Sequence, residues 1–258
     1  MSLKIIVCVK AVVVGAPGGR VIRSSNSCEL NPFDRPPLEA ALRMKEEKGA
    51  SLTVLSMGPP SCAFVLHEAI AMGAARGILV SDPALAGSDT LATSAALGAA
   101  LQKLAPFDLV LFGTRSADGD TGHVGPQTAV LLDLPLVGSV DLIEKKGAGL
   151  VVERTLDGFR ESFEVRLPAA LTIHPGFSEP RDVPLAGIQG AFEREQVETW
   201  SLSNLGLSAE QVGEKGSPTR VTAISKADRR RKCEFLSGSE EEQAEQVAQR
   251  LTEWGLLE

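Results

Sequence analysis

The chain has 258 residues, of which 43% are hydrophobic and 23% are charged, and this composition is typical of a globular protein with a sizeable core. Its formal net charge of −7 argues against nucleic acid as the main partner, because such binding depends largely on neutralising phosphates. The basic run at residues 229–232 is interpreted as a solvated segment.

The four cysteines are widely separated and show no C-x-x-C spacing, which argues against a zinc site or a disulfide framework. No stretch approaches the ~20 apolar residues that span a bilayer. The N-terminal apolar run is typical of a buried strand and not of a signal peptide. We therefore expect no membrane insertion and, by default, a cytoplasmic location.

In chain order, short apolar runs alternate with longer amphipathic segments, and glycine or proline separates most of them. Residues 12–30 carry several of these breakers and should form a loop or a hairpin, and Ser88 is a plausible N-cap. The alternation predicts right-handed βαβ units around a parallel sheet. The expected strands are residues 4–9, 52–56, 77–80, 108–112 and 169–173, and the expected helices are residues 38–48, 61–71, 89–104 and 120–132.

Two later regions depart from this alternation. Residues 150–154 and 162–165 alternate apolar and polar side chains, which predicts antiparallel strands added to the sheet. Beyond residue 180 the periodicity is weak, and only residues 240–254 show helical spacing. We therefore expect a nucleotide-binding α/β domain at 1–190 and a C-terminal arm at 191–258 that packs on another chain.

The most informative candidate site is the segment GTRSADGDTGHVG at residues 113–125, which follows a buried strand and opens a helix. Ligands of open α/β sheets bind beyond the carboxyl ends of the strands, where helix N-termini attract phosphate. Ser116 and Thr121 add hydroxyl donors, and His123 is either a donor to a ligand or a surface histidine. The spacing matches neither common phosphate-binding motif, so a plain surface loop remains an alternative.

Asp118 and Asp120 in this segment are interpreted as helix caps and hydrogen-bond acceptors, in preference to a metal site or an acid–base pair. His67 and His174 lack partners at metal-ligand spacing and are interpreted as structural. The sequence contains no nucleophile motif of the kind that hydrolases use, so we expect no catalytic residue and no metal site in this chain.

Five segments together resemble the β subunit of electron-transfer flavoproteins, in the order that this family shows. The resemblance covers nearly the whole chain. The segments are KIIVCVKAV at 4–12, NPFDRPPLEAALRMKEEKG at 31–49, VLSMGPPSCAFVLHEAIAMGAARGILV at 54–80, LVLFGTRSADGDTGHVGPQTAVLLDLP at 109–135 and LPAALTIHPGFSEPRDVPLAGI at 167–188.

The resemblance implies a doubly wound, mostly parallel α/β fold of the adenine nucleotide alpha hydrolase-like kind, with added antiparallel strands and a C-terminal arm on an α subunit. It also implies that Leu185 anchors the chain to acyl-CoA dehydrogenase-type flavoenzymes. The residues that it places at a nucleotide are Cys8, Asn31, Pro32, Phe33, Asp34, Met57, Gly113, Ser116, Asp118, Gly119, Asp120, Thr121, Gly122, His123 and Val124.

The family resemblance further implies a heterodimer that shuttles electrons, with one FAD held mainly by the α subunit and either AMP or a second FAD in this chain. The loop form at 118–126 and the run at 216–219 look closer to the electron-bifurcating group, which holds FAD. The glycine-rich loop at 15–19 is unlike the usual Pro-Asp-containing loop of the family. His123 replaces a common glutamine, Ala74-Ala75-Arg76 lacks the usual aspartate, and Thr155 stands where some members carry glutamate.

Three other interpretations remain open at this point. The chain could be a universal-stress-like ATP-binding module without a redox role, but that class gives no reason for the arm. It could be an ATP-pyrophosphatase, but the Ser-Gly-Gly loop of that class is missing. It could be a structural subunit with a vestigial nucleotide site.

Overall fold

The computed structural model describes residues 2–13, 27–193, 196–223, 233 and 235–257. The glycines at 15–19 and the basic run at 229–232 lie outside the described residues. Among the described residues, no helix is long and apolar enough to cross a membrane.

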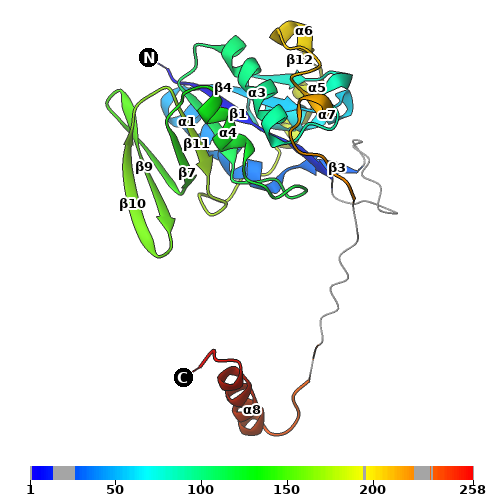
Figure 1. Cartoon of the computed structure of the whole chain (residues 1–258). Helices are drawn as coiled ribbons and strands as arrows, with labels where there is room; N and C mark the ends of the chain where they lie inside the picture. The colour runs from blue at the N-terminus through cyan, green and yellow to red at the C-terminus, as the bar shows by residue number, and fades with distance from the viewer. Residues whose placement is uncertain (1, 14–26, 194–195, 224–232, 234, 258) are drawn as a thin grey trace. The chain divides into compact units, whose positions relative to one another are not determined.

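The core of the fold is a seven-stranded sheet in the order β12-β5-β4-β1-β6-β11-β7, in which every paired neighbour is parallel (Figure 1). The expected α/β class with a mainly parallel sheet is therefore confirmed. The strands are β1 (Lys4–Cys8), β4 (Ser51–Met57), β5 (Arg76–Val80), β6 (Leu109–Gly113), β7 (Leu136–Val140), β11 (Ala169–Ile173) and β12 (Val197–Trp200).

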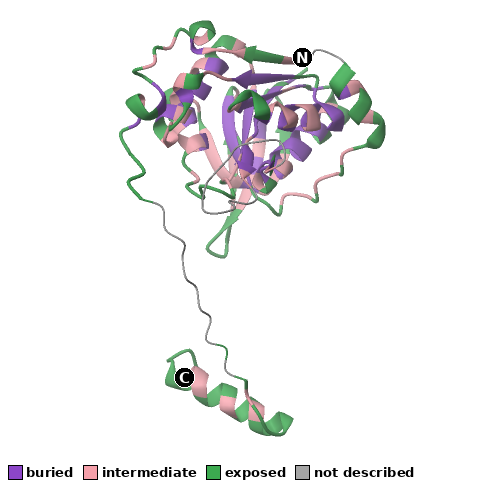
Figure 2. Cartoon of the chain, turned by 90° about the vertical axis from the view of Figure 1, so that its right-hand side faces the viewer, coloured by how far each residue is buried: buried purple, intermediate pink, exposed green. Residues whose placement is uncertain are grey.

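Helices cover both faces of this sheet, which is why its central strands are continuous apolar runs. In β1, Ile5 and Val7 face a cluster that includes residues of α1 (Arg35–Lys48) and α2 (Phe64–Met72). Ile6 and Cys8 face a second cluster with residues of α3 (Thr90–Leu104) and α4 (Val124–Leu131). Figure 2 shows the buried residues gathered in the central strands and on the helix sides that meet them.

Shorter strands and helices lie around this sheet and its helices. β2 and β3 form a small antiparallel pair, and α5 packs on α2. These elements are β2 (Ala11–Val13), β3 (Cys28–Leu30), η2 (Pro32–Asp34), η3 (Pro60–Ala63), η4 (Pro83–Leu85), α5 (Leu185–Glu193), α6 (Leu202–Leu205) and α7 (Gly213–Gly216).

The antiparallel strands expected at 150–154 and 162–165 are present, but they are not part of the main sheet. β8 (Leu142–Lys146), β9 (Gly149–Leu156) and β10 (Phe159–Val165) form a separate three-stranded sheet in the order β10-β9-β8. Their alternating pattern reflects one buried face, with Leu150 and Val152 in the core. Such alternation reports half-burial but does not say which sheet a strand joins.

The domain boundary expected at residue 190 also needs correction. β12 pairs in parallel with β5 at the edge of the main sheet, and the first compact unit continues to Val221. The second unit, Thr222–Glu258, contains α8 (Glu240–Glu253), which begins with a capping box between Ser239 and Glu242. The helix expected at 240–254 is thus present, in a shorter arm than predicted.

Two helix starts differ from the sequence prediction. Asp89 caps α3, because its Oδ1 accepts the N–H groups of Leu91 and Ala92, while the Ser88 hydroxyl donates to the carbonyl of Leu85. α4 starts at Val124 and not near residue 120. Asp120 and Gly122 adopt positive φ angles of 52° and 66°, a conformation that does not continue into a right-handed helix.

Candidate functional site

The candidate site lies at the carboxyl edge of three adjacent strands, β4, β1 and β6. Met57, Cys8 and Gly113 are the last residues of these strands, so parallel pairing brings them to one edge. Cys8 and Met57 lie on the α3–α4 side of the sheet. Burial, and then the nearby Asp34 carboxyl, raise the pKa of the Cys8 thiol, so this cysteine stays neutral and acts as a packing group.

Asn31 connects this edge to the glycine-rich loop. Its side-chain Nδ2 donates to the carbonyl of Arg115 at 2.9 Å, and its Oδ1 accepts the N–H of Ala117 at 3.1 Å. The side chain also hydrogen-bonds to Asp34, and Asn31 is only 1% exposed. Its amide is therefore engaged within the protein, and its role is to hold the loop in place.

Asp34 joins the ends of two strands in the same way. Its Oδ2 accepts the N–H of Lys10 at 2.8 Å, and its carboxyl also accepts the N–H of Gly113. Burial raises the pKa of Asp34 to about 7, although these N–H donors and the Asn31 amide act in the opposite direction. A Cβ at Gly113 would overlap the Asp34 carboxyl and the carbonyl of Phe33, so this junction requires glycine.

Two ion pairs fix the loop that follows β6. Lys10 Nζ lies 2.6 Å from Asp118 Oδ1 and 3.2 Å from the Ser116 hydroxyl. Arg115 pairs with Asp120 at 3.2 Å, and its guanidinium lies 4.6 Å from the centroid of the Phe33 ring. Asp118 and Asp120 therefore act as acceptors, as expected, but neither caps α4.

The N-terminus of α4 is open to an anion. His123 occupies the N-cap position, and among the described residues no side chain caps this helix. The first N–H groups of a helix lack partners within it, and together with the helix dipole they attract negative charge. Gly119, Thr121 and His123 beside this end are exposed, and Gly122 is partly exposed. This arrangement fits a phosphate group, with Lys10 as a nearby cation.

Most of the predicted residues thus come together. Cys8, the segment Asn31–Asp34 and the loop from Gly113 to Val124 are linked by the contacts above, and Met57 ends the neighbouring strand. Leu185 lies elsewhere: it is the first residue of α5, on α2, and is 85% exposed. The role predicted for Leu185 concerns a partner protein, so its separation from the carboxyl edge of the sheet does not contradict that prediction.

Sequence reasoning did not include Lys10 and Arg115 among the site residues. Each was accessible from the sequence, because Lys10 directly follows the first strand and Arg115 lies in the glycine-rich segment. A basic residue at the carboxyl edge of a parallel sheet is a signal for phosphate in its own right. Their acidic partners, up to 108 positions away, could not be paired without the fold.

The two histidines interpreted as structural have protein partners. His67 Nδ1 lies 2.8 Å from the carbonyl of Ala191, and its ring stacks on Phe192 with centroids 4.6 Å apart. His174 accepts the N–H of Gly176 at 3.0 Å through Nδ1. These contacts are consistent with that interpretation.

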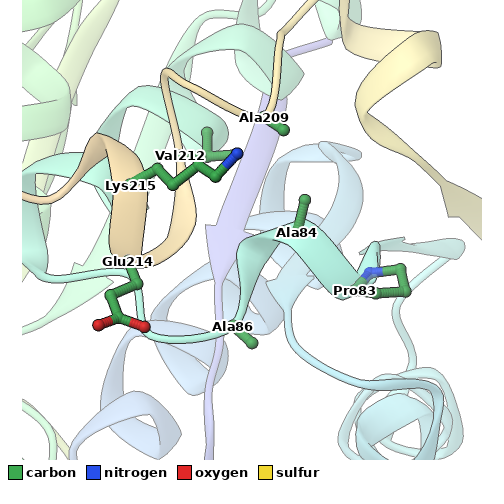
Figure 3. A pocket seen from close by; sticks show the side chains of 7 residues that line it. All are labelled: Pro83, Ala84, Ala86, Ala209, Val212, Glu214 and Lys215. Atoms are coloured by element: carbon green, nitrogen blue, oxygen red, sulfur yellow. The ribbon is translucent and has the colours of Figure 1, made fainter.

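A separate hollow of about 280 Å³ lies between η4 and the segment that ends in α7 (Figure 3). Small apolar side chains form most of its lining, and none of the predicted site residues contributes. Figure 3 shows the Glu214 carboxylate and the Lys215 ammonium group reaching away from each other. The lining residues are Pro83, Ala84, Ala86, Ala209, Val212, Glu214 and Lys215.

Comparisons with known proteins show which sequences this chain is similar to. Residues 18–205 match the family model described as an electron transfer flavoprotein domain. The chain is 38% identical over 231 residues to an electron transfer flavoprotein subunit beta of Thermoanaerobacterium thermosaccharolyticum, covering 90% of this chain and 88% of that one. It is 36% identical over 257 residues to the subunit of the same name in Clostridium acetobutylicum, covering 97% and 98%. It is 39% identical over 226 residues to the caffeyl-CoA reductase-Etf complex subunit CarD of Acetobacterium woodii, covering 85% and 86%.

Proposed function

The chain belongs to the electron-transfer flavoprotein family as a β subunit with an electron-transfer function, and from this premise we propose that its glycine-rich loop holds the phosphates of an adenine nucleotide. The comparisons favour this class over a universal-stress-like module. The observation that carries the proposal is that no described side chain caps the N-terminus of α4. The loop before this helix carries Lys10 on Asp118, and Asn31 holds the loop against the sheet edge.

The contacts of individual residues indicate which of them would shape the loop and which would bind the ligand. Asn31 and Asp34 are buried and act on the shape of the loop and not on the ligand. Lys10 is partly exposed and would exchange its contact with Asp118 for the phosphates. Backbone N–H groups at the start of α4 would donate hydrogen bonds to the phosphates, so no side chain is needed for these contacts.

A partner α subunit would hold the redox-active FAD, and this chain would complete that binding site. A flavin accepts electrons and passes them on, whereas the protein supplies binding, orientation and electrostatics. The arm 222–258 is proposed to pack on the α subunit. Its helix α8 has no buried residue; Val247 on this helix is 44% exposed, and Trp254, which directly follows it, is 67% exposed.

The nucleotide in this chain is proposed to be AMP or a second FAD, which share the adenylate group that the loop would bind. The relative from A. woodii is named as part of a caffeyl-CoA reductase-Etf complex, which supports the FAD alternative and a role in electron bifurcation. The run at 216–219 supports neither. Ser217 accepts the N–H of Asp89 at 2.8 Å and Thr219 donates to its Oδ2 at 2.8 Å, so these hydroxyls serve the packing of α7.

Leu185 is proposed as the anchor for an acyl-CoA dehydrogenase-type flavoenzyme. It is 85% exposed, and Ile188 and Phe192 follow it on α5 with exposures of 39% and 64%. Spacings of three and seven residues place these side chains along one side of a helix. An exposed apolar row of this kind is a typical protein-docking surface.

The decisive experiment is to coexpress the chain with its α subunit and to count the nucleotides released by denaturation. Two FAD per heterodimer would support the bifurcating alternative, and one FAD with one AMP would reject it. Release of one FAD and no second adenine nucleotide would reject nucleotide binding at the loop. Release of ATP would point back to the stress-like module.

A further inference from the structure

Arg181 ties the segment before α5 to helix α1. Its Nε and Nη2 donate to the carboxylate of Glu39 at 2.8 and 3.1 Å, and its backbone N–H donates to the same group at 3.2 Å. Nη2 also donates to Glu46 at 3.0 Å. One planar cation therefore bridges two carboxylates that lie about two turns apart on α1.

The inner part of this contact is buried. The Glu39 side chain is 4% exposed and that of Arg181 is 31% exposed. Burial acts to raise the pKa of Glu39, but hydrogen bonds from Arg181 and Arg43 outweigh it and hold the pKa below its ordinary value. Hydrogen bonds to Glu46 and Glu39 raise the pKa of Arg181. The cluster is thus charged and geometrically specific.

The helix α5 has a second attachment, on α2. Gly187 approaches the carbonyl of Ala71 so closely that a Cβ would overlap it, and the His67 ring stacks on Phe192. These contacts hold the body of α5 against its neighbour. They lie after Leu185, whereas Arg181 lies only four residues before it. Along the chain, the exposed Leu185 therefore has one attachment before it and one after it.

We propose that Arg181 is a positioning residue for partner docking: through Glu39 and Glu46 it fixes the start of α5 and so presents Leu185 in one orientation. This inference rests on the docking role proposed above for Leu185. A leucine on a loosely held helix end would lose conformational freedom on binding, and the clamp reduces that cost before the partner arrives.

The test uses the full chain in complex with its α subunit and four single substitutions. Arg181→Met removes the charge and the forked donors, and Arg181→Lys keeps the charge alone. Arg43→Met is the matched control, because Arg43 pairs with the same Glu39 carboxylate at 2.9 Å from within α1. Leu185→Ala tests the docking surface itself.

Two readouts are compared. The first is amide hydrogen exchange of residues 182–193. The second is electron transfer from a purified acyl-CoA dehydrogenase that has been reduced by its acyl-CoA substrate. We expect Arg181→Met to speed exchange about tenfold and to raise KM for the dehydrogenase roughly tenfold at unchanged kcat. Arg181→Lys should recover part of both effects, and Arg43→Met should show neither.

Each outcome decides a separate point. Unchanged exchange in Arg181→Met overturns the positioning role, as does an equal change in Arg43→Met. Faster exchange with unchanged KM also overturns it if Leu185→Ala raises KM, because the partner then docks without a fixed helix. If Leu185→Ala leaves KM unchanged, the proposed docking surface fails, and the exchange data alone decide whether Arg181 fixes α5.

Discussion

Replacing Asn31 by alanine should detach the glycine-rich loop from the sheet edge while leaving the core intact. The substitution removes the hydrogen bonds to Arg115 and Ala117 and the contact with Asp34. Asn31 belongs to neither of the two apolar clusters between the strands and the helices, so these helices should keep their packing. The loss should therefore appear first in the affinity for the nucleotide.

The magnitude follows from these bonds. A neutral hydrogen bond contributes about 1 kcal/mol net, and less where water can replace the lost partner. Arg115 and Ala117 are exposed residues, so water can reach their freed groups. The two loop bonds should together contribute about 1–2 kcal/mol to the bound geometry, which corresponds to a loss of roughly 5- to 30-fold in affinity.

Calorimetric titration of AMP and of FAD into the nucleotide-free complex would measure this loss. Asn204→Ala is the matched control, since Asn204 Oδ1 accepts the N–H of Ser201 in the local capping box of α6. That variant should lose about 1 kcal/mol of stability and keep its affinity. An Asn31→Ala complex that binds both nucleotides as tightly as the wild type would refute the reasoning.

Three further perturbations address the same edge. Gly113→Ala places a Cβ against Asp34 and should cost about 1–3 kcal/mol or more of unfolding free energy and most of the bound nucleotide. Lys10→Met removes the cation beside Asp118 and should weaken nucleotide binding about tenfold. Folding raises the pKa of Asp34 from 3.8 to about 7, so the folded protein binds this proton more tightly than the unfolded chain does. The contribution of Asp34 to the free energy of unfolding is therefore full below pH 3.8 and is lost as the pH rises towards 7. The loss is at most about 4 kcal/mol, and thermal unfolding of wild type and Asp34→Asn at pH 5 and pH 8 would reveal it.

Each of these has a control. Gly190→Ala adds a methyl group where nothing lies within 4 Å and should stay folded and loaded. Lys146→Met, on β8, breaks an exposed ion pair with Glu164 of β10 and should leave nucleotide content unchanged. A Lys10 variant with wild-type affinity would remove the proposed cation from the site. A difference in melting temperature between wild type and Asp34→Asn that does not vary with pH would contradict the titration.

The central strands could be predicted from the sequence because burial on both faces requires unbroken apolar runs, as β1 and β11 show. The edge strand β12 could not, because its burial is partial and its Glu198 and Thr199 are exposed. The start of α4 was misplaced because the left-handed backbone at Asp120 carries no strong sequence signal.

The candidate site divides in a similar way. The composition of the glycine-rich segment was enough to predict it as a candidate site, and the family resemblance placed Asn31 and Asp34 beside it. Their orientation was beyond the sequence, because both side chains point into contacts with Lys10, Arg115 or Ala117 that are distant along the chain. We therefore propose that Asn31 and Asp34 shape the loop and leave the contact with the ligand to other residues.

The close approach of Gly187 to α2 has a consequence for how partner choice could be redesigned. Any side chain at Gly187 would push α5 away from Ala71, so the inner side of this helix admits almost no variation. Leu185 and Ile188 point outward and are free of that constraint, whereas Phe192 is held by its stacking on His67. A new binding preference could thus be built by exchanging the two outer side chains on an unaltered backbone.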